Sequence, residues 1–120
     1  MSLRGILDDI VRNVDGSLAA MIMACDGVVI DEVSVERTEI DIPLLSAECA
    51  AVLGEIKSAV DSIKMGNLEE VSIATARINV AVRIFTDDYF AVLILKHDGN
   101  IGKGRYLLRH KSFEILRELS

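Results

Sequence analysis

The chain has few of the residues that build cross-linked, metal-binding or nucleophilic sites. It contains two cysteines, Cys25 and Cys49, and two histidines, His97 and His110. Both cysteines lie inside apolar runs without CxxC spacing, which favours small buried residues in a reducing cytosol over a disulfide or a metal ligand. Neither histidine has a cysteine or histidine at metal-ligand spacing, so we expect both at the solvated surface. The sequence therefore predicts no catalytic residue, no cofactor and no metal site.

Long apolar runs and an excess of positive charge are also missing. No apolar run approaches the roughly 20 residues needed to cross a bilayer. Charged residues at Asp8, Asp9 and Arg12 interrupt the N-terminal segment, unlike the apolar core of a signal peptide. With 13 basic residues against 19 acidic ones, the net charge is −6, which argues against a general affinity for nucleic acid or anionic lipid. We expect a cytoplasmic protein with no nucleic-acid partner and no membrane insertion.

Length and composition bound the fold. A chain of 120 residues is expected to form one domain, residues 1–120, that buries roughly two thirds of its unfolded-state surface. Hydrophobic residues make up 51% of the chain, at or above the usual range for a soluble monomer. This content indicates buried surface beyond one small core, so we expect a homo-oligomer.

Residues Leu44 to Met65 are predicted to form one long helix with two distinct non-polar faces. At about 100° per residue, one arc carries the large apolar side chains of a helix that packs on a sheet: Leu45, Cys49, Val52, Leu53, Ile56, Val60 and Ile63. The opposite arc carries small residues, with a lysine and an aspartate beside them: Ala47, Ala50, Ala51, Gly54, Ser58, Lys57 and Asp61. Glycine inside a helix costs roughly 1 kcal/mol relative to alanine. Close approach of a second backbone to this face would explain Gly54.

The remaining elements follow from periodicity and turn residues. Asp26-Gly27 between two apolar runs predicts a hairpin, and the nearly all-apolar last strand is predicted to be central. Ser34–Pro43 is read as a polar surface connection, with the proline suited to the first turn of the long helix. The expected elements are helix Leu3–Val14, strands Leu18–Cys25 and Val28–Ile30, the long helix, strands Glu69–Ala76, Ile78–Phe85 and Tyr89–Lys96, and a terminal helix Ile101–Leu119.

Two features near the C-terminus invite a binding role. Gly102-Lys103-Gly104 precedes a helix, but a phosphate-binding loop needs GxxxxGK followed by Ser or Thr, and here His97 and Gly104 occupy the positions of the first glycine and the Ser or Thr. The terminal helix is the one basic region of the chain. Its basic residues form either an exposed helix face or a surface for an acidic partner. They are Lys103, Arg105, Arg109, Lys111 and Arg117.

The ordered set of local sequences resembles the Roadblock/dynein light chain family across nearly the whole chain. The resemblance is carried by LRGILDDIVRNVDG, LAAMIMACDGVVID, SAECAAVLGEIKSAV, YFAVLILK and DGNIGKGRYLLR. It implies an α/β fold of profilin or longin type, in the order α-β-β-α-β-β-β-α. In that fold a five-stranded antiparallel sheet carries the long helix on one face and the two terminal helices on the other.

The resemblance also implies a function. Family members dimerise by pairing their long helices and joining their third strands, which implies a homodimer interface of small helix residues and strand residues: Ala47, Ala50, Ala51, Gly54, Ser58, Asp61, Val71 and Ile73. Members similar to the mutual-gliding protein B type bind and regulate a small Ras-like GTPase without inserting an arginine finger. The alternative is a scaffold or adaptor subunit with no effect on GTP hydrolysis. A third class, an enzyme or small-ligand sensor, would need a cluster of polar groups that the sequence does not offer.

Overall fold

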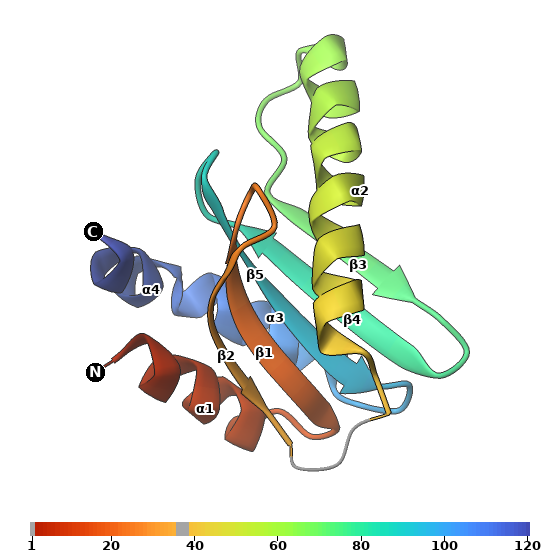
Figure 1. The fold of residues 1–120 in the computed structure, drawn as a ribbon, viewed down its shortest axis with the longest axis vertical. Helices are drawn as coiled ribbons and strands as arrows, with labels where there is room; N and C mark the ends of the chain where they lie inside the picture. Colours follow the sequence, from red (N-terminus) through yellow and green to blue (C-terminus); the bar gives the residue numbers. More distant parts are fainter. Residues whose placement is uncertain (1, 36–38) are drawn as a thin grey trace.

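A computed structural model describes residues 2–35 and 39–120. Its elements are α1 (Leu3–Asn13), β1 (Ser17–Ala24), β2 (Val29–Ser34), α2 (Ile42–Ile63), β3 (Glu70–Ala74), β4 (Ile78–Ile84), β5 (Tyr89–Lys96), α3 (Ile101–His110) and α4 (Ser112–Leu119). The strands form one antiparallel sheet in the order β2-β1-β5-β4-β3. Helix α2 crosses one face of the sheet, and α1, α3 and α4 cover the other (Figure 1). The predicted fold class is confirmed.

The first hairpin forms where Asp26-Gly27 predicted it. Gly27 has a φ of +97°, and its amide donates to the Ala24 carbonyl at 3.0 Å. Strand β2 continues to Ser34 rather than ending at Ile30, because it lies at the sheet edge, where every second residue can face water. Residues 36–38 of the predicted connection Ser34–Pro43 lie outside the described residues.

Strand β5 is central, as its apolar sequence predicted, and it has a core on each face. The core under α1, α3 and α4 takes five buried side chains from these helices: Ile6, Leu7, Ile10, Leu108 and Ile115. On the other face, α2 contributes Cys49 and Leu53 as its buried apolar side chains. The α2 face of the sheet is therefore more thinly covered than the opposite face.

The predicted packing stripe of α2 was wrong in part. Cys49 and Leu53 are buried, but Val52 is 45% exposed and Ile63 is 64% exposed. The C-terminal turns of α2 extend past the ends of the strands (Figure 1), so Ile63 has no sheet beneath it. The helix begins at Ile42, two residues before the predicted start, because the Asp41 carboxylate caps it by accepting from the Leu44 amide at 3.1 Å.

Two further expectations need correction. The predicted terminal helix is broken at Lys111, which adopts φ −91° and ψ 4°. The break turns α4 so that Ile115 is buried beside α1, and the Lys111 Nζ lies 3.1 Å from the Asp9 Oδ2. Cys25 is exposed rather than buried, because β1 ends at Ala24 and Cys25 begins the turn. Cys49 is buried, and both histidines are exposed, as expected.

Gly16 provides a stability test of the packing between the α1–β1 and β5–α3 turns. Its φ is +85°, and an added Cβ would lie 2.6 Å from the Gly99 Cα. Gly16→Ala should therefore lower the free energy of unfolding by about 2 kcal/mol or more, as measured by urea denaturation. Gly66→Ala is the matched control, because Gly66 also has a positive φ, +102°, but no atom lies within 4 Å of an added Cβ. Equal losses in the two variants would contradict a steric role for Gly16.

Candidate interaction surface

Helix α2 has a groove along each flank of its buried stripe. The β3 groove, a cavity of about 140 Å³, lies between α2 and the edge strand β3. It is lined by Leu45, Glu48, Cys49, Val52, Leu53, Ile56, Val71, Ile73 and Val82. The hairpin groove, of about 230 Å³, lies between α2 and two turns, the one that joins β1 to β2 and the one that joins β4 to β5. It is lined by Cys25, Ala50, Leu53, Gly54, Lys57, Ser58, Asp61, Ile84 and Phe90.

The β3 groove is almost entirely apolar and is open to solvent at the sheet edge. Val52 of α2 is 45% exposed, and Ile73 of β3 is 37% exposed. Strand β3 pairs only with β4 among the described strands, so one side of its backbone presents free N–H and C=O groups. An apolar groove beside an unpaired strand edge can receive another helix and strand at the same time.

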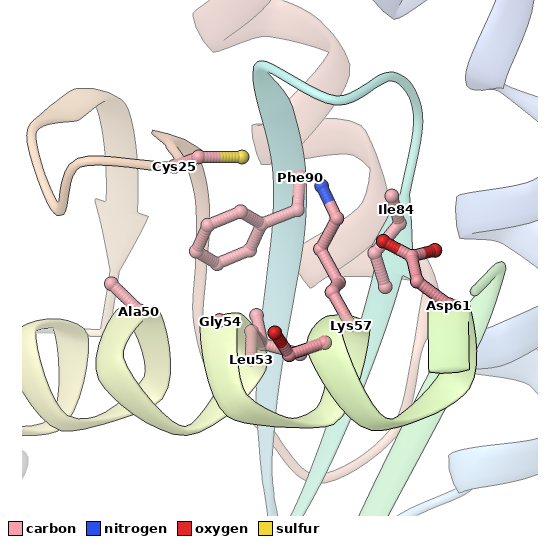
Figure 2. Close-up of a pocket in the computed structure, with 9 residues that line it drawn as sticks. Cys25, Ala50, Leu53, Gly54, Lys57, Asp61, Ile84 and Phe90 are labelled. Carbon is pink, nitrogen blue, oxygen red and sulfur yellow. The ribbon is translucent and has the colours of Figure 1, made fainter. Parts of the chain in front are cut away.

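The hairpin groove combines an apolar floor with a polar rim. Figure 2 shows Phe90 and Leu53 beneath the groove, with Cys25 toward one end and Asp61 toward the other. The Lys57 ammonium lies 3.6 Å from the Asp87 Oδ1 and donates to the Asp87 carbonyl at 3.4 Å. This ion pair ties α2 to the turn between β4 and β5.

Cys25 has a structural role at the rim of the hairpin groove. Its Sγ donates to the Asp87 carbonyl at 2.7 Å, which links the two hairpin turns. Burial is the largest influence on the pKa of the Cys25 thiol and raises it; Lys57 opposes this effect, and nearby aspartates raise the pKa further. The thiol therefore stays protonated at neutral pH and serves as a hydrogen-bond donor rather than as a nucleophile.

The eight sequence-predicted interface residues are distributed over β3, one flank of α2 and the exposed face of α2, and their assignment to one dimer interface stays a prediction. Val71 and Ile73 line the β3 groove. The hairpin groove, on the other flank of α2, is lined by four of the set: Ala50, Gly54, Ser58 and Asp61. Ala47 and Ala51 are exposed on α2 and line neither groove. Val52 and Ile56 also line the β3 groove, although both lie in the predicted packing stripe. The helix sequence alone carries no signal that distinguishes them from core residues.

The described ranges lack the features of two further classes of site. Residues 2–35 and 39–120 contain no group of three or more His, Cys, Asp or Glu side chains placed to hold a metal ion. No helix in the same ranges has the length and apolar content to cross a membrane.

The chain matches no family model and no curated protein, but solved structures match it over nearly its full length. MglC from Myxococcus xanthus is 35% identical, with a TM-score of 0.71, and the match covers 98% of this chain and 99% of MglC. A Roadblock/LC7 domain from Streptomyces avermitilis is 14% identical, with a TM-score of 0.82 over 99% of this chain and 98% of that domain. Gliding protein MglB from Thermus thermophilus is 14% identical, with a TM-score of 0.86 over 97% of this chain and 87% of MglB.

The sheet order, the placement of α2 and these matches define a Roadblock-type domain. The chain belongs to the Roadblock/LC7 family. Within that family its sequence is similar to the gliding protein MglC.

Proposed function

We propose that this protein is a homodimeric, non-catalytic cytoplasmic module that binds a small Ras-like GTPase and stimulates its GTP hydrolysis. The observation that carries the proposal is the pair of grooves on opposite flanks of α2. One flank can pair with a second copy while the other stays open for a partner. The family resemblance supplies the identity of that partner.

The β3 groove is the flank that suits a second copy. Pairing two β3 edges in one continuous sheet satisfies their free backbone groups and places two α2 helices side by side on the same face. The flanks of α2 that would then meet carry Val52 and Ile56. Their burial, with that of Ile73, would cover the apolar surface that the protomer leaves exposed. Self-association is compatible with the tetrameric arrangement of one MglB structure.

The hairpin groove is the flank that suits the GTPase. In the proposed dimer it faces away from the partner copy. Its lining joins the aromatic side chain of Phe90 and other apolar residues to polar side chains, and an apolar centre with a polar rim is the usual arrangement at protein interfaces. The family resemblance implies that such a module inserts no arginine finger, so it would act by holding catalytic residues that belong to the GTPase.

Single-turnover GTP hydrolysis tests the proposal directly. The small Ras-like GTPases of the same genome would be loaded with GTP and assayed with and without saturating amounts of this protein. We expect a rate increase of about tenfold or more with one of them, equivalent to about 1.4 kcal/mol off the barrier. Co-migration with a GTP-loaded GTPase on a sizing column without a rate increase would identify a scaffold or adaptor instead. Absence of binding to all of them would contradict the proposal.

A further inference from the structure

Three arginines gather on the face of the sheet opposite α2. Arg83 lies on β4, and Arg105 and Arg109 lie one turn apart on α3. They line a groove of about 340 Å³ at the β3 edge, together with Glu69, Glu70, Gly102 and Tyr106. We call this the arginine groove. Its volume is at the lower end of the roughly 300–1,000 Å³ usual for ligand pockets.

The positive charge in the arginine groove is only partly compensated. Glu70 is held by Arg105, whose Nε donates to Oε1 at 2.7 Å and whose Nη2 donates to Oε2 at 3.0 Å. These hydrogen bonds lower the pKa of Glu70, and the charges of Arg83 and Arg109 lower it further. In the described part of the chain, no carboxylate forms an ion pair with Arg83 or Arg109. Arg83 and Arg109 therefore interact electrostatically with Glu70 without forming an ion pair with it, and their guanidinium N–H groups can bind an anion.

Exposed aromatic side chains lie on α3, which lines the groove, and on α4, which follows it in the chain. Tyr106 is 60% exposed and stacks on His110, with ring centroids 5.4 Å apart. Phe113, at the start of α4, is 74% exposed, and the Arg117 guanidinium lies 5.8 Å from its ring centroid. Arginine, tyrosine and phenylalanine are enriched at protein interfaces. Partly compensated arginines beside the Tyr106 ring match a peptide that has acidic and apolar side chains.

We propose that the arginine groove binds a short acidic peptide segment of a partner protein, through Arg83 and Arg109, with Arg105 held in place by Glu70. The compact groove favours this occupant over an extended anionic surface. A membrane or a nucleic acid would also meet Glu69 at the rim and a protein of net charge −6. The inference does not rest on GTPase binding at the hairpin groove, because the arginine groove lies on the opposite face of the sheet from α2. In the proposed dimer, pairing of the β3 strands would place the second copy beside Glu70, so the arginine groove would lie next to the dimer interface.

Fluorescence anisotropy with a fluorescein-labelled octaglutamate peptide tests the proposal on the full chain. We expect saturable binding that weakens as salt is raised. The double variant Arg83→Glu/Arg109→Glu should bind at least about tenfold more weakly. The double variant Arg12→Glu/Arg77→Glu is the matched control, because it makes the same change in net charge at two exposed arginines outside the groove. Arg109→Ala, at an exposed helix position, tests the groove without altering the sheet.

The possible results of these experiments distinguish an acidic peptide from a free anion and from a lipid surface. Loss of binding in the groove variants but not in the control supports the proposal. An equal loss in the control, or no binding of octaglutamate by the native chain, overturns it. If millimolar inorganic phosphate competed as effectively as the unlabelled peptide, the groove would be a site for free anions. If the chain bound phosphatidylserine vesicles through these arginines but did not bind the peptide, the groove would be a lipid site. Either result also overturns the peptide proposal.

Discussion

Replacing Val52 by glutamate should raise the dissociation constant of the proposed dimer by about a hundredfold or more, because the new carboxylate would be buried without a partner between two α2 helices. In the protomer the same position is 45% exposed, so the carboxylate can remain hydrated and the fold is retained. Sedimentation velocity over a concentration series measures the dissociation constant, and thermal unfolding followed by circular dichroism checks the fold.

Val28→Glu is the matched control for this variant. Val28 is also an exposed valine, at 56%, but it lies in the turn between β1 and β2, away from the β3 groove. The control should leave self-association unchanged. A Val52→Glu dimer of native affinity would exclude the β3 flank of α2 as the interface. If Gly54→Leu then dissociated the dimer, the small-residue flank would be the interface instead.

The fold could be predicted from local sequence wherever a residue pattern is compatible with only one local structure. The sequence Asp26-Gly27 predicted the hairpin because glycine adopts the positive φ that the turn needs. The apolar run Tyr89–Lys96 predicted a central strand because its side chains are covered on both faces. The family resemblance added the layer order, which periodicity alone does not determine.

Two errors arose where side-chain contacts decide where an element ends. Lys111 lies within an amphipathic pattern that continues through it, and the break is stabilised by the burial of Ile115 beside α1. For Lys111 the deciding partner is therefore absent from the local pattern. A local contact decides the other error: β3 ends at Ala74 rather than at the predicted Ala76, because the Thr75 hydroxyl accepts from the Ile78 amide at 3.0 Å and closes the turn there.

The candidate site was only partly predictable for a related reason. Helical periodicity separates the faces of α2 only in part, because it does not show where the sheet ends beneath the helix. Val52 and Leu53 are neighbours in the predicted packing arc, yet Leu53 is 5% exposed and Val52 is 45% exposed. The difference depends on the position of β3, which is the edge strand. The sequence of the helix alone therefore does not identify Val52 as an interface residue.

If the proposed function is correct, Gly54→Leu should weaken binding of the proposed GTPase partner by about thirtyfold or more, equivalent to about 2 kcal/mol, and should abolish the proposed stimulation of hydrolysis at matched concentrations. Gly54 lines the hairpin groove, and no atom lies within 4 Å of an added Cβ. The leucine side chain would therefore occupy space that the partner needs without disturbing the protomer. Removing a glycine from a helix interior should raise protomer stability by up to about 1 kcal/mol, so weaker binding could not be attributed to unfolding.

Ser62→Leu is the matched control for Gly54→Leu, since it adds the same side chain at an exposed position of α2 that lines neither groove. Binding of the GTP-loaded GTPase would be measured by titration calorimetry, and self-association by sedimentation. Loss of GTPase binding in Gly54→Leu, with the dimer intact and the control unaffected, would support the hairpin groove as the docking site. Native affinity in Gly54→Leu would exclude this groove. If Val52→Glu also abolished GTPase binding, the docking surface would include residues from both copies, because only the dimer would then present it in full.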